Sequence, residues 1–253
     1  MKTIIVKKLA IGEGMQKICV PIVGKTKADI LGAAGKICET PADLVEWRAD
    51  WFEGVFDVKV VCGVLSELRT VLGEMPLLFT FRTKAEGGEQ EISNDEYEHL
   101  LLQVSQTGLV DMIDVEAYLH EEIPCLISKL KENGVVIVGS NHDFAKTPEK
   151  DEIVKRLVYM KEVGADLPKI AVMPKTEADV ETLLTATKEV ANLLKTPIIT
   201  MAMGTLGEIS RTSGEIYGSA ITFGAVGRVS APGQIEVLKL KEILEKVHRE
   251  KAE

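Results

Sequence analysis

One lysine lies inside an apolar segment, residues 167–173. If this segment is a strand, its side chains alternate between two faces, so Lys169 and Ala171 share one face while Ile170 and Val172 share the other. Burial disfavours an ammonium group, and a neutral amine can attack a carbonyl carbon. The alternative is a lysine at the start of a strand whose charged end extends back to solvent. The spacing leaves both interpretations open.

A histidine ends a second apolar run. His142 follows the segment Val135–Ser140, which is rich in β-branched residues. Imidazole takes up and releases protons near neutral pH, so it suits general acid–base catalysis. A single histidine is often structural, but the carboxyl end of a strand favours a catalytic role. His99 and His248 lie among charged residues in helical segments, where we expect them to be exposed, and His120 is ambiguous.

Arginine is scarce in this chain, with seven residues, and its distribution is uneven. Four of the seven lie at or just after the ends of expected strands: Arg48, Arg82, Arg211 and Arg228. Glu46 lies two residues before Arg48, on the same face of its strand, and Glu86 lies in the loop after Arg82. A guanidinium group offers a planar fork to a carboxylate or to polar oxygens of a ligand. Each arginine alone could instead hold a loop by pairing with an acidic residue.

These residues need a scaffold, and short apolar runs alternate with helical segments along the chain. The expected strands are Ile18–Val23, Leu44–Arg48, Leu77–Arg82, Met112–Glu116, Val135–Ser140, Lys169–Met173, Ile198–Met203 and Ala220–Phe223. The clearest helical segments are Val58–Leu72, Asp95–Thr107, Glu149–Val163 and Glu177–Leu194. Eight strands with helical crossovers predict an α/β fold, a single (β/α)8 barrel over residues 1–253. A doubly wound open sheet is the alternative.

The chain ends and the composition narrow the prediction further. Residues 1–14 fall outside the repeat, and we expect a short N-terminal hairpin that closes the bottom of the barrel. In such a barrel the active site lies at the carboxyl ends of the strands. Of the 253 residues, 45% are hydrophobic and only 5% aromatic, which suits a core of aliphatic side chains.

Charge and motif content exclude several classes of protein. The net charge of −9 argues against non-specific binding to nucleic acid or an anionic membrane. No apolar stretch approaches the ~20 residues of a membrane span. The four cysteines are scattered without CxxC or zinc-ligand spacing, so we expect reduced thiols in a cytoplasmic protein without a metal site.

In six short motifs the chain resembles the type I 3-dehydroquinate dehydratases of the shikimate pathway. The motifs are Glu46-Trp47-Arg48-Ala49-Asp50, Phe81-Arg82-Thr83 with Glu86-Gly87-Gly88-Glu89, Asn141-His142-Asp143-Phe144, Pro168-Lys169-Ile170-Ala171, Met203-Gly204 with Ser210-Arg211, and Ser230-Ala231-Pro232-Gly233-Gln234. They run in order from the second expected strand to the last loop, so the resemblance covers essentially the whole chain. Each motif alone is weak, but six in order are specific.

The resemblance implies a role for each residue and a metal-free, cofactor-free reaction on 3-dehydroquinate. Lys169 would form a Schiff base, His142 would transfer protons, and Glu86 would orient His142. The implied substrate-binding residues are Glu46, Arg48 and Arg82 for hydroxyls, Arg211 with Ser230 and Gln234 for the carboxylate, and Met203. It also implies a homodimer.

Three other functions compete with this interpretation. A class I aldolase also uses a barrel lysine as a Schiff base, but it cleaves a carbon–carbon bond, usually in a phosphorylated sugar. A metal-dependent hydrolase would need ligands such as Glu46, Glu116 and His142, yet no HxH or HExxH spacing supports one. A barrel that only binds its ligand would need the same polar pocket without a reactive amine.

Overall fold

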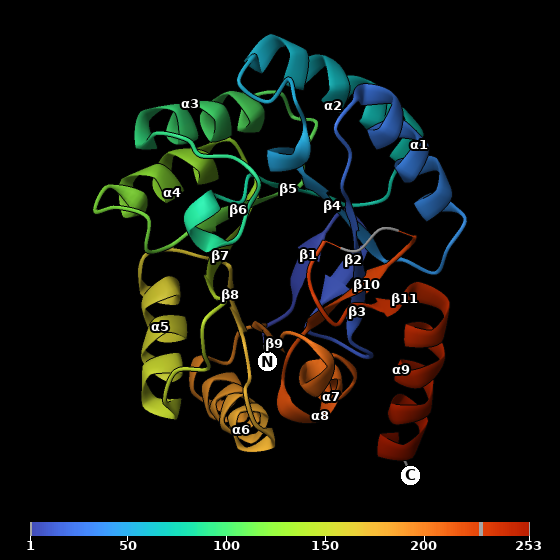
Figure 1. Ribbon diagram of the computed structural model, residues 1–253, viewed down its shortest axis with the longest axis vertical. Coiled ribbons are helices and arrows are strands. Elements are labelled where there is room, and N and C mark those ends of the chain that lie inside the picture. Colours follow the sequence, from blue (N-terminus) through green and yellow to red (C-terminus); the bar gives the residue numbers. More distant parts are fainter. Residues whose placement is uncertain (1, 228–229, 253) are drawn as a thin grey trace.

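The computed structural model describes residues 2–227 and 230–252, and in this part of the chain a parallel sheet curls into a barrel surrounded by helices (Figure 1). The barrel strands are β3 (Lys17–Ile22), β4 (Leu44–Arg48), β5 (Leu77–Thr80), β6 (Met112–Glu116), β7 (Val136–Asp143), β8 (Leu167–Val172), β9 (Ile199–Ala202) and β10 (Ile221–Ala225). Consecutive strands pair in parallel from β3 to β9, and β10 pairs with β3. A bridge between Ile198 and Ser219 joins the β9 and β10 sides. The predicted barrel is confirmed, and the open-sheet alternative is wrong.

Helices cover the outside of the ring, as the alternating pattern predicts. They are α1 (Lys27–Cys38), α2 (Val58–Leu72), α3 (Asn94–Ser105), α4 (Ile123–Glu132), α5 (Lys150–Glu162), α6 (Glu177–Leu194), α7 (Glu208–Thr212), α8 (Gly214–Tyr217) and α9 (Val237–Ala252). Capping boxes begin α1, α3 and α6, at Thr26, Ser93 and Thr176, and satisfy backbone N–H groups that the helix leaves free. A short strand, β11 (Ile235–Glu236), pairs with β10 before α9.

The two faces of the strands form separate cores. On β3, Ile18, Val20 and Ile22 pack in the cluster between strands and helices. Cys19, on the opposite face, belongs to a smaller cluster inside the barrel. This division follows from the two-residue period of a strand.

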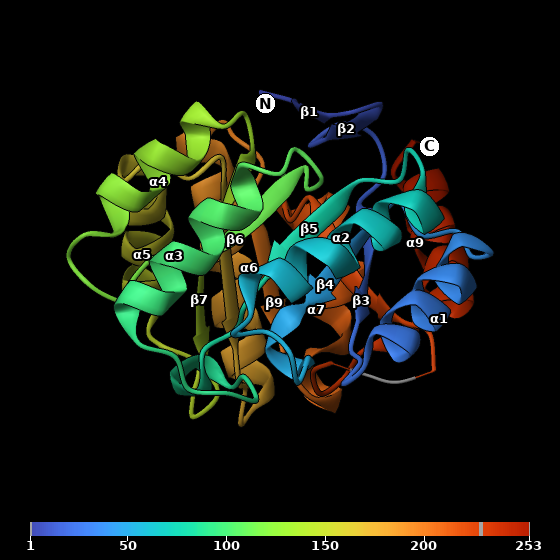
Figure 2. The ribbon, with the colours of Figure 1, turned by 90° about the horizontal axis from the view of Figure 1, so that it is seen from above.

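The predicted N-terminal hairpin is present and closes one end of the barrel. Strands β1 (Ile4–Val6) and β2 (Leu9–Ile11) pair antiparallel, and Figure 2 shows them at one end of the molecule, beyond the strands. Val6 and Ile11 are buried in the interior cluster, where they pack with residues from the first half of the barrel strands. The carboxyl ends of the strands therefore form the open end.

Three strand boundaries differ from the prediction in ways that affect the site. Strand β7 ends at Asp143 rather than Ser140, so Asn141 and His142 belong to the strand. Strand β8 begins at Leu167 rather than Lys169, so the lysine is the third residue of the strand. Strand β5 ends at Thr80, so Arg82 belongs to the loop that follows. In the described residues no helix is both long and apolar enough to cross a membrane.

Candidate active site

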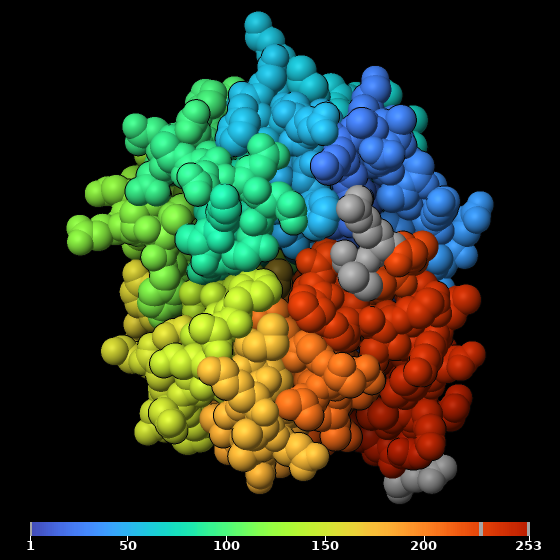
Figure 3. Space-filling view, viewed as in Figure 1, coloured from blue at the N-terminus to red at the C-terminus, as the bar shows by residue number. Residues whose placement is uncertain are grey.

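A pocket of about 480 Å³ lies at the carboxyl ends of the strands. Its walls are Glu46, Arg48, Arg82, Glu86, Gly87, His142, Phe144, Lys169, Ala171, Met201, Met203, Arg211, Phe223, Ser230, Ala231 and Gln234. Figure 3 shows this face of the molecule, where segments that lie far apart in the sequence, as their colours show, meet around a central hollow. The structure thus brings together the ten residues to which the resemblance assigns a role.

Lys169 extends into the barrel interior, with 4% of its surface exposed. Its Nζ lies 3.2 Å from Asp114 Oδ2 and 3.6 Å from Glu46 Oε1, and 4.7 Å from the centre of the Phe223 ring. The side chain therefore does not extend back to solvent from the start of the strand. Its surroundings also differ from the apolar environment expected from the sequence, because two carboxylates lie beside the amine.

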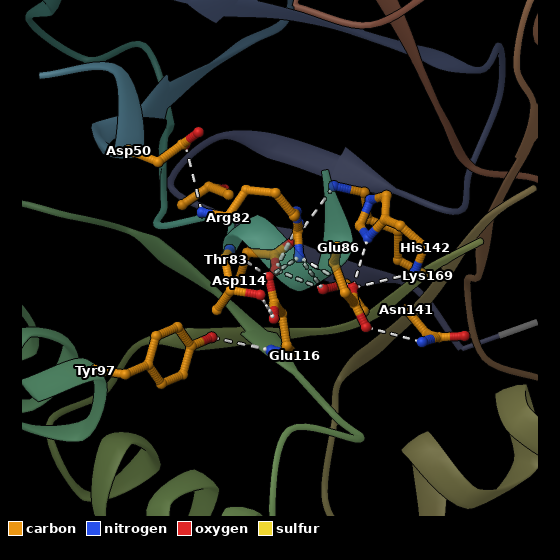
Figure 4. A network of polar contacts seen from close by, with 12 residues as sticks. Asp50, Arg82, Thr83, Glu86, Tyr97, Asp114, Glu116, Asn141, His142 and Lys169 are labelled. Atoms are coloured by element: carbon orange, nitrogen blue, oxygen red, sulfur yellow. Dashed lines mark hydrogen bonds and ion pairs between the residues drawn. The ribbon is translucent and has the colours of Figure 1, made fainter. Parts of the chain in front are cut away.

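His142 and Glu86 form a pair at the wall of the pocket. The Nδ1 atom of His142 lies 2.9 Å from Glu86 Oε2, which also accepts the backbone N–H of His142 at 3.0 Å. Glu86 ends a short 3-10 turn, Lys84–Glu86, which Gly87 closes at a φ of 85° that favours glycine. Figure 4 shows the two side chains facing each other.

Burial dominates the acid–base behaviour of this pair. Burial and, after it, the positive charges of Arg82, Lys169 and Arg48 hold the pKa of His142 well below its usual value. A neutral imidazole can accept a proton. Burial also raises the pKa of Glu86 to about 8, with a further contribution from Glu116. The sequence suggested a simple carboxylate partner, whereas the structure gives a buried carboxyl group whose pKa lies well above its usual value.

Arg82 is the centre of an ionic network beneath the pocket. It contacts Asp114 Oδ1 at 2.9 Å, Glu116 Oε1 at 2.9 Å and Ser140 Oγ at 3.0 Å, and Glu86 Oε2 at 3.5 Å. Since these partners occupy most of the guanidinium group, Arg82 orders the acidic residues as well as lining the pocket (Figure 4).

Arg48 is also paired within the protein. Its Nε and Nη2 atoms donate to the two carboxylate oxygens of Asp50, each at 2.8 Å. Burial opposes the charge, but Asp50 and Glu46 outweigh it and raise the pKa of Arg48. The Arg48 side chain therefore reaches the pocket in a fixed position, as expected of a preorganised binding residue.

In the described part of the chain, Arg211 on α7 has no carboxylate partner comparable to that of Arg48. Only 1% of its surface is exposed. Nη2 donates to the carbonyl of Pro232 at 3.0 Å, Nη1 lies 3.8 Å from Met201 Sδ, and Nε is buried without a hydrogen bond. Burial lowers the pKa of Arg211 to about 10. A buried, unneutralised guanidinium group at the pocket wall is suited to an anionic group of a ligand.

The last loop supplies the remaining predicted residues. The backbone N–H of Ser230 donates to Gln234 Oε1, and Gln234 Nε2 donates to Ser230 Oγ, both at 2.9 Å. The carbonyl of Pro232 accepts from Gly204 N at 3.2 Å as well as from Arg211. These bonds hold Ser230 and Gln234 on the same wall as the arginine. Met203 is buried beside them. Arg228, also noted in the sequence, lies outside the described residues.

Sequence reasoning assigned no role to Asp114, Ser140 and Asn141. Ser140 Oγ donates to Asp114 Oδ1 at 2.5 Å, and Asn141 Nδ2 donates to Glu86 Oε1 at 2.8 Å. For Asp114 the sequence did contain a signal. This residue lies two residues after Met112 on the same strand, so its side chain faces the interior as that of Met112 does. Among the residues that the structure describes, no group of three or more His, Cys, Asp or Glu side chains could hold a metal ion.

Comparison with known proteins agrees with this geometry. The family model of the type I 3-dehydroquinases matches residues 18–251. The 3-dehydroquinate dehydratase of Clostridioides difficile strain 630 is 52% identical over 246 residues, 96% of each chain, and that of Listeria monocytogenes serotype 4a is 49% identical over 99% of this chain and 100% of its own.

Solved structures agree as well. A Clostridium difficile type I 3-dehydroquinate dehydratase, crystallised with covalently modified comenic acid, gives a TM-score of 0.96 at 50% identity, over 98% of this chain and 99% of its own. The enzyme of Enterococcus faecalis gives 0.89 at 43% identity, over 96% and 98%. With the match over nearly its whole length and the matching residues gathered in one pocket, the chain belongs to the type I 3-dehydroquinase family and is a hydro-lyase.

Proposed function

We propose that the chain converts 3-dehydroquinate into 3-dehydroshikimate through a Schiff base on Lys169. The observation that carries the proposal is the position of the Lys169 amine, buried in a pocket that also contains the His142–Glu86 pair and an unneutralised arginine. The substrate has a ketone at C3, a removable proton at C2, a hydroxyl at C1 and a carboxylate. The pocket offers a group suited to each.

The reaction begins with the amine and the ketone. Lys169 attacks C3, and loss of the ketone oxygen as water gives an iminium ion. His142 removes a proton from C2, and the electron pair moves towards the iminium nitrogen. The enamine expels the C1 hydroxyl, which leaves as water after protonation by His142. A water molecule then hydrolyses the conjugated iminium and frees Lys169, so the net change is loss of one water.

Asp114 supports this chemistry by its charge. Burial alone would raise its pKa, but Arg82 and Lys169 outweigh burial and lower it, so the carboxyl group stays ionised. An ionised Asp114 at 3.2 Å from Lys169 Nζ stabilises the positive iminium ion that the mechanism requires.

The substrate is oriented by groups on opposite sides of the pocket. Arg211 takes the substrate carboxylate, with Ser230 and Gln234 beside it. Glu46 and Arg48 bind ring hydroxyls, and Arg82 contributes where its own ionic network leaves donors free.

A direct assay tests the proposed function. Incubation with 3-dehydroquinate should produce the ultraviolet absorbance of a conjugated enone, and Lys169→Ala should produce none. A sugar phosphate supplied instead should remain uncleaved. Cleavage of the sugar phosphate, with 3-dehydroquinate left unchanged, would replace the dehydratase with an aldolase.

We further propose that the chain acts in the cytoplasm as a homodimer. Exposed apolar side chains of the α7–α8 region, Leu206, Ile209 and Ile216, offer a surface that a second copy would cover. Light scattering after size-exclusion chromatography should give twice the 27.7 kDa mass of one chain, and a single-chain mass would reject the dimer.

A further inference from the structure

Arg156, on the outer helix α5, contacts the active-site pair through one intervening residue. Its Nη1 donates to Asn141 Oδ1 at 3.0 Å, and its Nε donates to Glu152 Oε1 at 2.8 Å. Its side chain is 23% exposed and is not part of the pocket wall. Asn141, in turn, donates to Glu86, as Figure 4 shows.

The contact with Arg156 determines which way the Asn141 amide faces. A guanidinium group donates hydrogen bonds and cannot accept them, so the atom of Asn141 that faces Arg156 must be its oxygen. The NH₂ group is then turned towards Glu86 Oε1, 2.8 Å away. A rotated amide would place its oxygen against the carboxyl group of Glu86, and this contact would be repulsive when Glu86 is ionised.

The other oxygen of Glu86 is already committed to His142. Oε2 lies 2.9 Å from His142 Nδ1 and accepts the His142 backbone N–H. The bond from Asn141 to Oε1 thus fixes the second end of the carboxyl group. It also favours ionisation, since the Asn141 hydrogen bond lowers the pKa of Glu86, which burial raises to about 8.

We propose that Arg156 is a positioning residue that fixes the Asn141 amide, and that the amide favours the ionised form of Glu86 and keeps it aligned with His142 during proton transfer. This inference rests on the proposed function, in which His142 moves the protons. It assigns a role to Asn141, a residue of the His142 motif, and to an arginine that lies away from the strand ends.

Several charged groups already act on this pair and remain in place. Glu86 faces Arg82 from its own loop and Glu116 and Asp114 from β6, while His142 also faces Lys169 from β8 and Arg48 from β4. A substitution at Arg156 leaves all of these groups unchanged. A change in the pH profile then comes from Arg156 itself, through its charge or through the amide that it fixes, and adding Arg156→Met to Asn141→Leu separates these two causes.

The test compares Arg156→Met with Arg156→Lys by measuring kcat/KM against pH. Loss of the donor lets the amide turn, the pKa of Glu86 rises, and the acidic limb of the profile should move up by about one pH unit. On the alkaline side of that limb kcat/KM should match the unsubstituted enzyme. Lysine keeps a donor for Asn141 Oδ1, so the acidic limb in Arg156→Lys should stay close to its position in the unsubstituted enzyme.

Two more variants make the result specific. Asn141→Leu should move the limb at least as far as Arg156→Met, and adding Arg156→Met to it should move the limb no further. Glu152→Gln, which removes the ionic partner of Arg156 but leaves the Arg156–Asn141 contact, should leave the limb in place. If Arg156→Met gives no folded protein, the position of the acidic limb can still be compared between Arg156→Lys and Asn141→Leu.

Two outcomes would overturn the inference. One is an unchanged limb in both Arg156→Met and Asn141→Leu; the other is an equal fall of kcat/KM at every pH, which indicates a purely structural role. Borohydride trapping of substrate on Lys169 separates this failure from failure of the proposed function. The adduct should form in all of these Arg156, Asn141 and Glu152 variants, and its absence from the unsubstituted enzyme would reject the Schiff base instead.

Discussion

The lower and upper halves of the barrel interior are built by the same strands, yet they have opposite character. Near the hairpin the interior is apolar, and two residues further along five of the eight barrel strands, β4 to β8, it becomes polar or charged, whereas on β9 and β10 it stays apolar at Met201 and Phe223. The change occurs between Leu44 and Glu46, Leu78 and Thr80, Met112 and Asp114, Val138 and Ser140, and Leu167 and Lys169. Each pair lies on one face of its strand because of the two-residue period.

The two halves therefore contribute to different properties: the apolar half to the stability of the fold and the charged half to the chemistry of the site. The apolar half contributes free energy of folding by removing hydrocarbon surface from water. The charged half gains little, because burying ions costs several kcal/mol each and their pairing only offsets that cost. Substitutions in the upper half should therefore change catalysis most, and those in the lower half should change stability.

Apart from loss of Lys169 itself, the largest effect on turnover in the upper half is expected at His142. His142→Ala removes the proton-transfer group, so kcat should fall roughly 10²–10⁴-fold. The imine should still form slowly and remain trappable by borohydride. His99→Ala, at an exposed histidine, is the control and should be fully active. Unchanged turnover in His142→Ala would assign proton transfer to another group.

Asp114→Asn should have the next largest effect. The amide keeps the size of the side chain but removes the charge that neutralises Lys169 and the iminium ion, so kcat should fall about 100-fold with a smaller change in KM. Steady-state kinetics measure both constants. A rise in KM at constant kcat would instead make Asp114 a residue that organises substrate binding.

At Arg211 the expected effect falls mainly on binding. Arg211→Ala leaves the substrate carboxylate without its cation, and KM should rise about 10- to 100-fold. Arg211→Lys should recover part of the loss, since lysine keeps the charge without the fork. Arg249→Ala, at an exposed position on α9, serves as the control and should match the unsubstituted enzyme.

The smallest effect on activity is expected in the lower half. Ile11→Ala should leave kcat and KM unchanged at temperatures where the protein is folded, but it should lower the free energy of unfolding by about 2–4 kcal/mol. Ile11 is fully buried, whereas Ile5 in the same hairpin is 61% exposed. Ile5→Ala should therefore cost less than about 0.5 kcal/mol in a denaturant titration. A loss of activity in Ile11→Ala without a loss of stability would break the division between the halves.

The sequence predicted the barrel and its strands because alternation and period leave strong local signals. Strand β4 and helices α2 and α6 have the predicted bounds, and the hairpin lies where it was expected. The predicted site residues meet in one pocket because the carboxyl ends of parallel strands converge. Local pattern was sufficient for these features.

Ion pairs between side chains of different strands could not be predicted from the sequence. The Arg48–Asp50 pair is local, since the two residues lie two positions apart in the chain. Arg82, in contrast, is bound by Asp114 and Glu116 of β6, whereas Arg211 forms no ion pair within residues 2–227 and 230–252. Such pairings depend on register and side-chain geometry across several strands. For the same reason the acidic surroundings of Lys169 could not be predicted from its apolar neighbours along the chain.

The central claim is that Lys169 binds the substrate covalently, and borohydride reduction tests it most directly. Borohydride added with 3-dehydroquinate should fix an adduct, and peptide mass mapping should place it on Lys169. Lys169→Ala should form no adduct and show no turnover, while borohydride without substrate should leave the protein unmodified. An adduct on another lysine, or full activity in Lys169→Ala, would contradict the account.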